Sequence, residues 1–267
     1  MSPDPQKPQN PQKSQKADPR RAADTRSGSS RKKKPQREVL LALQGLRVGY
    51  GDPVCAPVDL EIGVGEAVCL VGANGAGKST VLRAVAGLLE PLGGKVLLRG
   101  RAIDERSAEF RRQVACVFDE DAWFAELSVA EHLELVARGH GVRDIEAVVD
   151  AELEAQKLTG AADQLPTSLS SGQKRRLLMA AALVRPRALL LLDEPEQRLD
   201  PTGRETLAAR LAAERDAGTS MLLATHDVVL LRHLADRAVV IDDHPDGASC
   251  RVVDAEEAAR IVSDPVQ

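Results

Sequence analysis

Aromatic side chains are scarce in this sequence, at 2% of its 267 residues. A hydrophobic core must therefore be built from Leu, Val, Ile and Ala, and the 43% hydrophobic content is sufficient for one large domain. Long apolar runs are missing too, because none approaches the ~20 residues needed to cross a bilayer. The basic start of the chain is followed by no apolar stretch, so we expect no secretory signal. Any work at a membrane would require a membrane-spanning partner.

Cysteine is also rare, and its spacing argues against two common roles. The four cysteines, Cys55, Cys69, Cys116 and Cys250, are far apart and form no C-x-x-C pair. We therefore expect these cysteines to form neither disulfides nor a metal site, which suits a reducing cytoplasm. Cys69 and Cys116 fall in predicted buried strands, where a free thiol acts as a small hydrophobe.

The net charge of −4 conceals an asymmetry between the start of the chain and the rest. Residues 1–37 carry eleven Lys and Arg against three Asp, a net charge of +8. This stretch is rich in Pro, Gln and Lys and nearly free of large apolar residues, which predicts a disordered basic tail. We favour a solvated extension over contact of Arg31–Lys34 with lipid headgroups or nucleic acid. Nucleic-acid contact in particular is disfavoured because aromatic residues are not interleaved. Residues 38–267 are predicted to form the ordered domain.

Strand and helix patterns alternate through the predicted domain. Val58–Ile62 alternates apolar and polar residues, which indicates a half-buried strand. Continuous apolar runs indicate buried strands at Ala67–Val71, Val114–Phe118, Ala188–Leu192, Ser220–Ala224 and Ala238–Ile241. Residues 120–185 contain no strand signal and are predicted to be a helical insertion, in which Ser128 and Glu131 form a capping-box pattern.

A phosphate-binding motif follows the first buried run. Residues 72–80 fit G-x-x-x-x-G-K-[ST] between the strand Ala67–Val71 and a helical pattern at 81–89, the context that this motif requires. Glycines let backbone N–H groups cradle phosphate oxygens, and the start of a helix favours the same anion. The alternative is a glycine-rich turn with an incidental lysine. The candidate nucleotide-binding residues are Gly72, Asn74, Gly75, Ala76, Gly77, Lys78, Ser79 and Thr80.

Three other apolar runs also end in polar residues. They are followed by Asp119, by Asp193-Glu194 and by His226, at the strand ends where open α/β sheets bind ligands. Taken singly, each has a plain structural explanation, such as a charged strand exit or a buried histidine. A fifth motif, Leu169–Gln173, reads LSSGQ at the start of a predicted helix.

In this order and spacing, the motifs resemble the ATPase domain of the ATP-binding cassette (ABC) superfamily, over about Val39–Ile261. The resemblance implies an α/β fold: a P-loop NTPase (RecA-like) core with a mostly parallel sheet, an N-terminal antiparallel β subdomain and a helical subdomain insertion. It also implies ATP and Mg²⁺ as the bound groups. Lys78 resembles the phosphate-binding lysine, and Ser79, Asp119 and Asp193 resemble the residues of the Mg²⁺ shell.

The resemblance assigns the remaining roles residue by residue. Glu194 resembles the general base that polarises water, and His226 resembles the histidine that senses the γ-phosphate. Tyr50 fits the aromatic residue that stacks on adenine, although exposed turn tyrosines are common. The signature residues would bind the γ-phosphate held by a second ATP-binding subunit, which implies a head-to-tail homodimer or heterodimer. They are Ser170, Ser171, Gly172 and Gln173.

The chain departs from the family pattern at three places. Ser171 occupies a position where glycine is typical, and Asp119 stands where the family usually has glutamine. Aspartate can bind a metal but cannot donate a hydrogen bond as an amide does, so coupling to a partner is the property in doubt. The loop Gln197–Asp200 is bulkier than is common in the family.

The leading hypothesis is the ATP-hydrolysing subunit of an ABC transporter, of export type, which drives a separately encoded transmembrane permease. It would be cytoplasmic and peripheral on the inner face of the membrane, with no specific nucleic-acid partner. Trp123 and Phe124 are candidate permease contacts, and their packing inside the helical insertion is the alternative. Two other hypotheses are a soluble ABC ATPase of a non-transport complex and a nucleotide-binding regulator without turnover.

Overall fold

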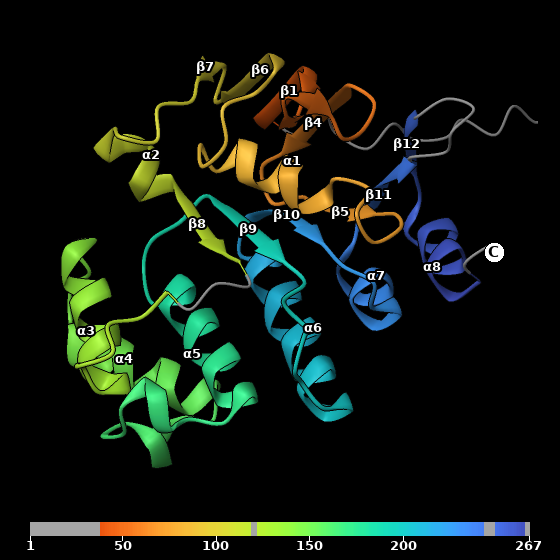
Figure 1. Cartoon of the computed structure of the whole chain (residues 1–267). Helices are drawn as coiled ribbons and strands as arrows, with labels where there is room; N and C mark the ends of the chain where they lie inside the picture. The colour runs from red at the N-terminus through yellow and green to blue at the C-terminus, as the bar shows by residue number, and fades with distance from the viewer. Residues whose placement is uncertain (1–37, 119–121, 243–248, 265–267) are drawn as a thin grey trace, which may run out of the picture. The chain divides into compact units, whose positions relative to one another are not determined.

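The computed structural model describes residues 38–118, 122–242 and 249–264 (Figure 1). The predicted tail, 1–37, and Asp119 lie outside the described residues. Within the described chain, one six-stranded sheet and one four-stranded sheet carry most of the strands.

The larger sheet has the strand order β12-β11-β5-β10-β9-β8. Its neighbouring strands run parallel, except that β12 is antiparallel to β11. The five predicted buried runs are confirmed as strands of this sheet. The strands are β5 (Ala67–Val71), β8 (Val114–Val117), β9 (Leu189–Asp193), β10 (Ser220–Ala224), β11 (Arg237–Asp242) and β12 (Ser249–Val253).

Strand β8 is the edge of this sheet, and its position overturns one expectation. Cys116 was expected to be buried, but its side chain is exposed, whereas Cys69 in the central strand β5 is fully buried. The apolar run around Cys116 indicates a strand but does not tell whether both of its faces are covered.

The smaller sheet is antiparallel, with the order β4-β1-β6-β7. The alternation in Val58–Ile62 is confirmed: its apolar side chains are buried and its two acidic residues are exposed. A short hairpin precedes it. The strands are β1 (Val39–Arg47), β4 (Val58–Gly63), β6 (Gly93–Leu98) and β7 (Arg101–Ala102), with β2 (Gly49–Tyr50) and β3 (Asp52–Pro53) in the hairpin.

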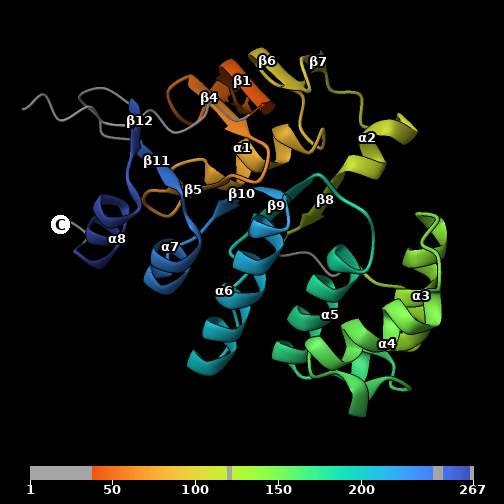
Figure 2. The same ribbon diagram turned by 180° about the vertical axis from the view of Figure 1, so that it is seen from behind.

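Each face of the six-stranded sheet has its own core. Alternate residues of its central strands, such as Leu191 and Leu222, pack with α1 and the smaller sheet. Leu190 and Leu223 pack on the opposite side with other helices. Figure 2 shows these helices on the side of the sheet opposite α1. Those are α6 (Pro201–Asp216), α7 (Val228–Leu234), α8 (Ala255–Ser263) and one side of α5 (Ser171–Leu183). Helix α1 (Lys78–Val85) is shorter than the 81–89 pattern predicted, because Gly87 adopts a left-handed φ of 74° just beyond it.

The predicted insertion forms a third core. Helices α3 (Val129–Gly139), α4 (Ile145–Ala155) and α5 pack together, away from the smaller sheet in both views (Figures 1 and 2). The capping box of Ser128 and Glu131 is present at the start of α3. A short helix, α2 (Ala108–Gln113), precedes β8 and was not predicted. Single turns at Thr159–Ala161 and Pro166–Ser168 lead into α5.

These layers confirm the predicted fold class. Among the described helices, none has both the length and the apolar character that a membrane span requires.

The core of the helical insertion provides a stability test. Leu133 is fully buried and Leu135, on the same helix, is 43% exposed. We expect Leu133→Ala to reduce the free energy of unfolding by about 2–5 kcal/mol through the lost apolar burial and the cavity it leaves. Leu135→Ala should change it by less than about 0.5 kcal/mol. Urea denaturation of both variants measures the difference, and equal losses would contradict this packing.

Candidate functional site

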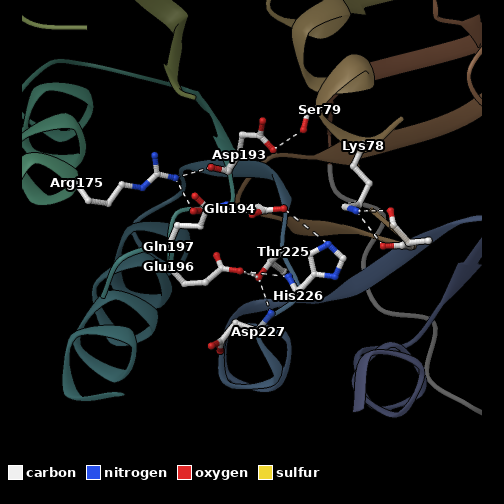
Figure 3. Close-up of polar contacts among 12 residues, drawn as sticks. Lys78, Ser79, Arg175, Asp193, Glu194, Glu196, Gln197, Thr225, His226 and Asp227 are labelled. Atoms are coloured by element: carbon white, nitrogen blue, oxygen red, sulfur yellow. Dashed lines mark hydrogen bonds and ion pairs between the residues drawn. The ribbon is translucent and has the colours of Figure 1, made fainter. Parts of the chain in front are cut away.

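The carboxyl ends of three parallel strands meet in one row. Ala224 of β10 pairs with Leu70 of β5 on one side and with Asp193 of β9 on the other. Beyond this row the backbone remains linked, since Glu194 donates its N–H to the Ala224 carbonyl at 2.9 Å. The phosphate loop, the acidic pair and the histidine loop therefore leave the sheet at one level (Figure 3).

The phosphate-binding candidates all lie in the loop between β5 and α1 and in the first turn of α1. Gly77, which precedes the helix, has φ 97°, and a Cβ there would come within 2.8 Å of the Val54 side chain. Only glycine fits that close approach without strain. The Lys78 ammonium donates to the carbonyls of Gly72 and Ala73 at 2.9 and 2.8 Å. The lysine is therefore held against its own loop, where a phosphate would be bound.

Ser79 and Asp193 form the part of the site that suits a divalent cation. The Ser79 hydroxyl donates to a carboxylate oxygen of Asp193 at 3.0 Å. Neighbouring oxygens of an octahedral Mg²⁺ shell are about 3 Å apart, so this donor pair fits the ion. Burial raises the pKa of Asp193, and the hydrogen bond from Ser79 opposes that rise. Among the described residues, clusters of three or more His, Cys, Asp or Glu that could hold a metal are lacking, as expected where phosphates supply other ligands.

Glu194 projects from a strained backbone position directly after β9. Its φ is 45°, in the left-handed region that non-glycine residues seldom occupy. One carboxylate oxygen accepts a hydrogen bond from the Gln197 amide. The other lies 3.8 Å from Nε2 of His226, longer than a hydrogen bond. The carboxylate is thus oriented toward the histidine and the lysine-bearing loop (Figure 3).

His226 has a lowered pKa, and a buried carboxylate binds its backbone. Burial and the charge of Lys78 lower its pKa, against a smaller opposing effect of Glu194. Its backbone N–H donates to Glu196 at 3.2 Å, and the Thr225 hydroxyl donates to the same Glu196 oxygen at 2.6 Å. Glu196 is 7% exposed, and burial raises its pKa.

Tyr50 and the signature residues lie on other elements. Tyr50 is 72% exposed in the β2–β3 hairpin, and the chain after this hairpin reaches the phosphate loop through Val54. Ser170 caps α5 and forms a reciprocal capping box with Gln173. Ser170 and Ser171 are exposed. The start of α5 therefore faces solvent in a single chain.

Arg175 and Glu196 were missed by the sequence reasoning. Arg175 is 3% exposed, and its guanidinium donates to backbone carbonyls at the ends of β8 and β9. The helical spacing could have revealed Arg175. It lies four and eight residues before Met179 and Leu183 on the apolar face of α5, so this spacing places an arginine on a buried face. Glu196 has no comparable signal, because its loop shows no periodicity.

Two cysteines that are distant in sequence come together beside the phosphate loop. The Cys55 thiol hydrogen-bonds with that of Cys250, which lowers the pKa of Cys55 and raises that of Cys250. Both are free thiols.

A mostly parallel sheet with a glycine loop before α1 and acidic residues after β9 defines a P-loop nucleotide-binding protein. The family model described as ABC transporter matches residues 55–197, and the chain belongs to that family as an ATP-binding subunit. A solved ATP-binding subunit of an ABC transporter superposes with a TM-score of 0.73 at 26% identity, covering 84% of this chain and all of that one. The cbiO1 protein of Clostridium perfringens, part of the complex cbiONQ, gives 0.69 at 26% identity, over 83% and 90%.

Curated relatives differ in what they transport. The Nod factor export ATP-binding protein I of Cupriavidus pinatubonensis is 37% identical over 78% of this chain and 65% of its own length. The SkfA peptide export protein SkfE of Bacillus subtilis is 35% identical over 76% and 86%. The spermidine/putrescine import protein PotA of Frankia alni is 40% identical over 73% and 42%. This chain thus spans less than two thirds of the first and third of these relatives.

The buried carboxyl of Glu196 gives a prediction for stability against pH. A raised folded-state pKa means that folding favours the protonated form, so ionisation costs stability as pH rises above the ordinary value near 4.5. Glu196→Gln removes this charge, and its Tm relative to the parent should therefore increase from pH 4.5 to pH 8. One pKa unit corresponds to about 1.4 kcal/mol, which scanning fluorimetry resolves. Glu205→Gln, at an exposed site on α6, should show no such trend. A flat difference for Glu196→Gln would contradict the burial effect.

Proposed function

We propose that the chain is the ATP-hydrolysing subunit of an export-type ABC transporter and that it drives a separately encoded transmembrane permease. The observation that carries this proposal is the meeting of Lys78, Ser79, Asp193, Glu194 and His226 at one end of the parallel sheet (Figure 3). They combine an anion site, a cation site and a carboxylate beside them, which suits hydrolysis of the terminal phosphoanhydride bond of ATP.

Binding of ATP would replace the hydrogen bonds that Lys78 makes to its own loop with contacts to phosphate. Lys78 would leave the carbonyls of Gly72 and Ala73 for the β- and γ-phosphates. The N-terminus of α1 favours the same negative charge. Ser79 and Asp193 would hold Mg²⁺, and this ion, when bound, neutralises charge that develops on the phosphate oxygens.

The hydrolytic step needs a carboxylate that can accept a proton from water. Glu194 is suited to this because Gln197 fixes one of its oxygens and leaves the other facing His226. A neutral His226 forms no ion pair with this Glu194 oxygen, so the carboxylate keeps its negative charge. The imidazole ring can also contact the γ-phosphate. The 3.8 Å separation leaves contacts that can tighten when substrate binds.

The exposed start of α5 supports a dimer of ATP-binding subunits. Backbone N–H groups at a helix N-terminus bind phosphate, and here Ser170 and Ser171 face solvent. In the proposed head-to-tail dimer, this helix end meets the γ-phosphate of the ATP on the second subunit. Tyr50, exposed on its hairpin, would stack on adenine.

The permease surface is proposed at the groove between β8, the end of α1 and α3. Phe124 and Leu88 are 55% and 63% exposed there. Trp123, in contrast, packs against the core of the helical insertion and lies under the Lys174 ammonium, 5.7 Å from its ring. We therefore assign permease contact to Phe124 and packing to Trp123. A location at the cytoplasmic face of the membrane follows from this proposal, and two export relatives support its direction.

Glu194→Gln tests the proposed base. The amide keeps the shape but cannot accept the proton, so turnover should fall by about 10²–10⁴-fold. ATP should still bind, and the uncleaved nucleotide should hold two subunits together. Phosphate release and size-exclusion chromatography with MgATP or MgADP measure the two effects. Unchanged turnover would contradict Glu194 as the base, and absence of phosphate release by the parent chain would favour a nucleotide-binding regulator without turnover.

Phe124→Ser tests the permease surface. Loss of an exposed aromatic anchor should weaken co-purification with the membrane subunits by at least about tenfold, since such anchors are often worth more than ~1.4 kcal/mol. Leu165→Ser, at a residue 45% exposed on the helical insertion, is the matched control and should co-purify normally. ATP affinity should be equal in both. Recovery of only soluble complexes with the parent chain would contradict the transporter assignment.

A further inference from the structure

Arg175 ties two strand ends of the site to the helix that carries the signature residues. Its guanidinium donates to the carbonyls of Asp193 and Glu194, both at 2.5 Å, and to that of Pro195 at 3.3 Å. It also donates to the carbonyl of Phe118 at 3.1 Å, directly beyond β8. One buried side chain of α5 therefore contacts the backbone at the ends of β8 and β9, and Figure 3 shows its contacts with Asp193 and Glu194.

These contacts explain why an arginine is buried here. A buried charge is costly unless many polar groups surround it, and the planar guanidinium has five N–H donors in a rigid fork. Here the guanidinium N–H groups donate to backbone carbonyls at the ends of the strands, where the hydrogen-bond pairing of the sheet stops. A lysine would reach the same place with a single compact charge, and it could not bridge both strand ends with the same geometry.

The contact at Glu194 has a consequence for the reacting side chain. The left-handed backbone of Glu194 requires support from its surroundings. Its N–H is bound by Ala224 of the sheet, and its carbonyl is bound by Arg175 of α5. The direction of the carboxylate toward His226 therefore depends on where α5 lies.

We propose that Arg175 is a positioning residue that couples the signature end of α5 to the carboxylate of Glu194 in the same subunit. This inference rests on the proposed function, in which the start of α5 meets the ATP of the second subunit. Arg175 lies just over one turn from Ser171, so both move together as one rigid segment. Closure on one nucleotide thereby sets the base that acts on the other.

Steady-state hydrolysis by the full-length chain with its membrane partner tests this coupling. Arg175→Gln should lower kcat by about 10- to 100-fold, as expected for a base misplaced by about 1 Å. The KM for ATP should stay within about twofold, and the Hill coefficient for ATP should fall toward one. Arg175→Lys should restore only part of kcat, because a point charge replaces the fork.

Arg187→Gln is the matched control. Arg187 is also a nearly buried arginine that donates to backbone carbonyls, those of Leu183 and Arg185, but it lies before the start of β9, at the opposite end of the strand. Its loss should reduce Tm and leave kcat per folded molecule unchanged. If Arg175→Gln behaves like this control, or changes kcat and KM in equal proportion, the positioning role is wrong.

The tryptophan of this chain provides a readout that needs no turnover. Trp123 is the single tryptophan and lies against Lys174 of α5. MgATP should change the fluorescence of Trp123 in the parent and in Arg187→Gln. The change should be smaller in Arg175→Gln. Titration with a fluorescent nucleotide should show equal ATP binding in all three proteins. Absence of hydrolysis by the parent would refute the proposed function alone. An equal fluorescence change in the parent and Arg175→Gln would refute the coupling.

Discussion

The common register of β5, β10 and β9 is the constraint on which the site depends. Because Leu70, Ala224 and Asp193 stand in one row, the three loops that follow begin at the same level. Ser79 and Asp193, 114 residues apart, then meet at 3.0 Å. A slip of one residue in β9 would turn Asp193 to the other face of the sheet. Alternate apolar side chains of these strands are buried on one side of the sheet or the other.

A second layer of side chains supports the backbone of these loops. Glu196 accepts from Thr225 and from the N–H of His226, and Arg175 donates to the carbonyls that follow β9. Both are buried, and both bind main-chain groups at or just beyond the ends of the strands. This is physically reasonable, because backbone groups that leave a ladder inside a protein need partners. The reacting carboxylate is therefore oriented by residues that do not face the substrate.

The sequence was sufficient for the central strands and for the meeting of Ser79, Asp193, Glu194 and His226 at one edge of the sheet. The runs Ala188–Leu192 and Ser220–Ala224, which precede Asp193 and Thr225-His226, indicate buried parallel strands. Parallel strands bring the polar residues at their carboxyl ends together. The exposure of Cys116 was not predictable, because it depends on the order of strands and on which one forms the edge. The contact of Cys55 with Cys250 likewise depends on where β12 docks. Glu196 escaped notice because hydrogen bonding in an irregular loop leaves no periodic pattern.

The departures from the family pattern adjoin the same contact. Asp119 follows Phe118, whose carbonyl binds Arg175. Gln197 donates to Glu194, and the backbone of Arg198 lies 3.3 Å from where a Cβ of Gly172, next to Ser171, would stand. The phosphate loop and Asp193 show no such departures. These departures therefore lie around the proposed link between α5 and Glu194. That distribution gives Arg175 its importance: its side chain, carried by α5, binds the backbone carbonyls of Phe118 after β8 and of Glu194 after β9.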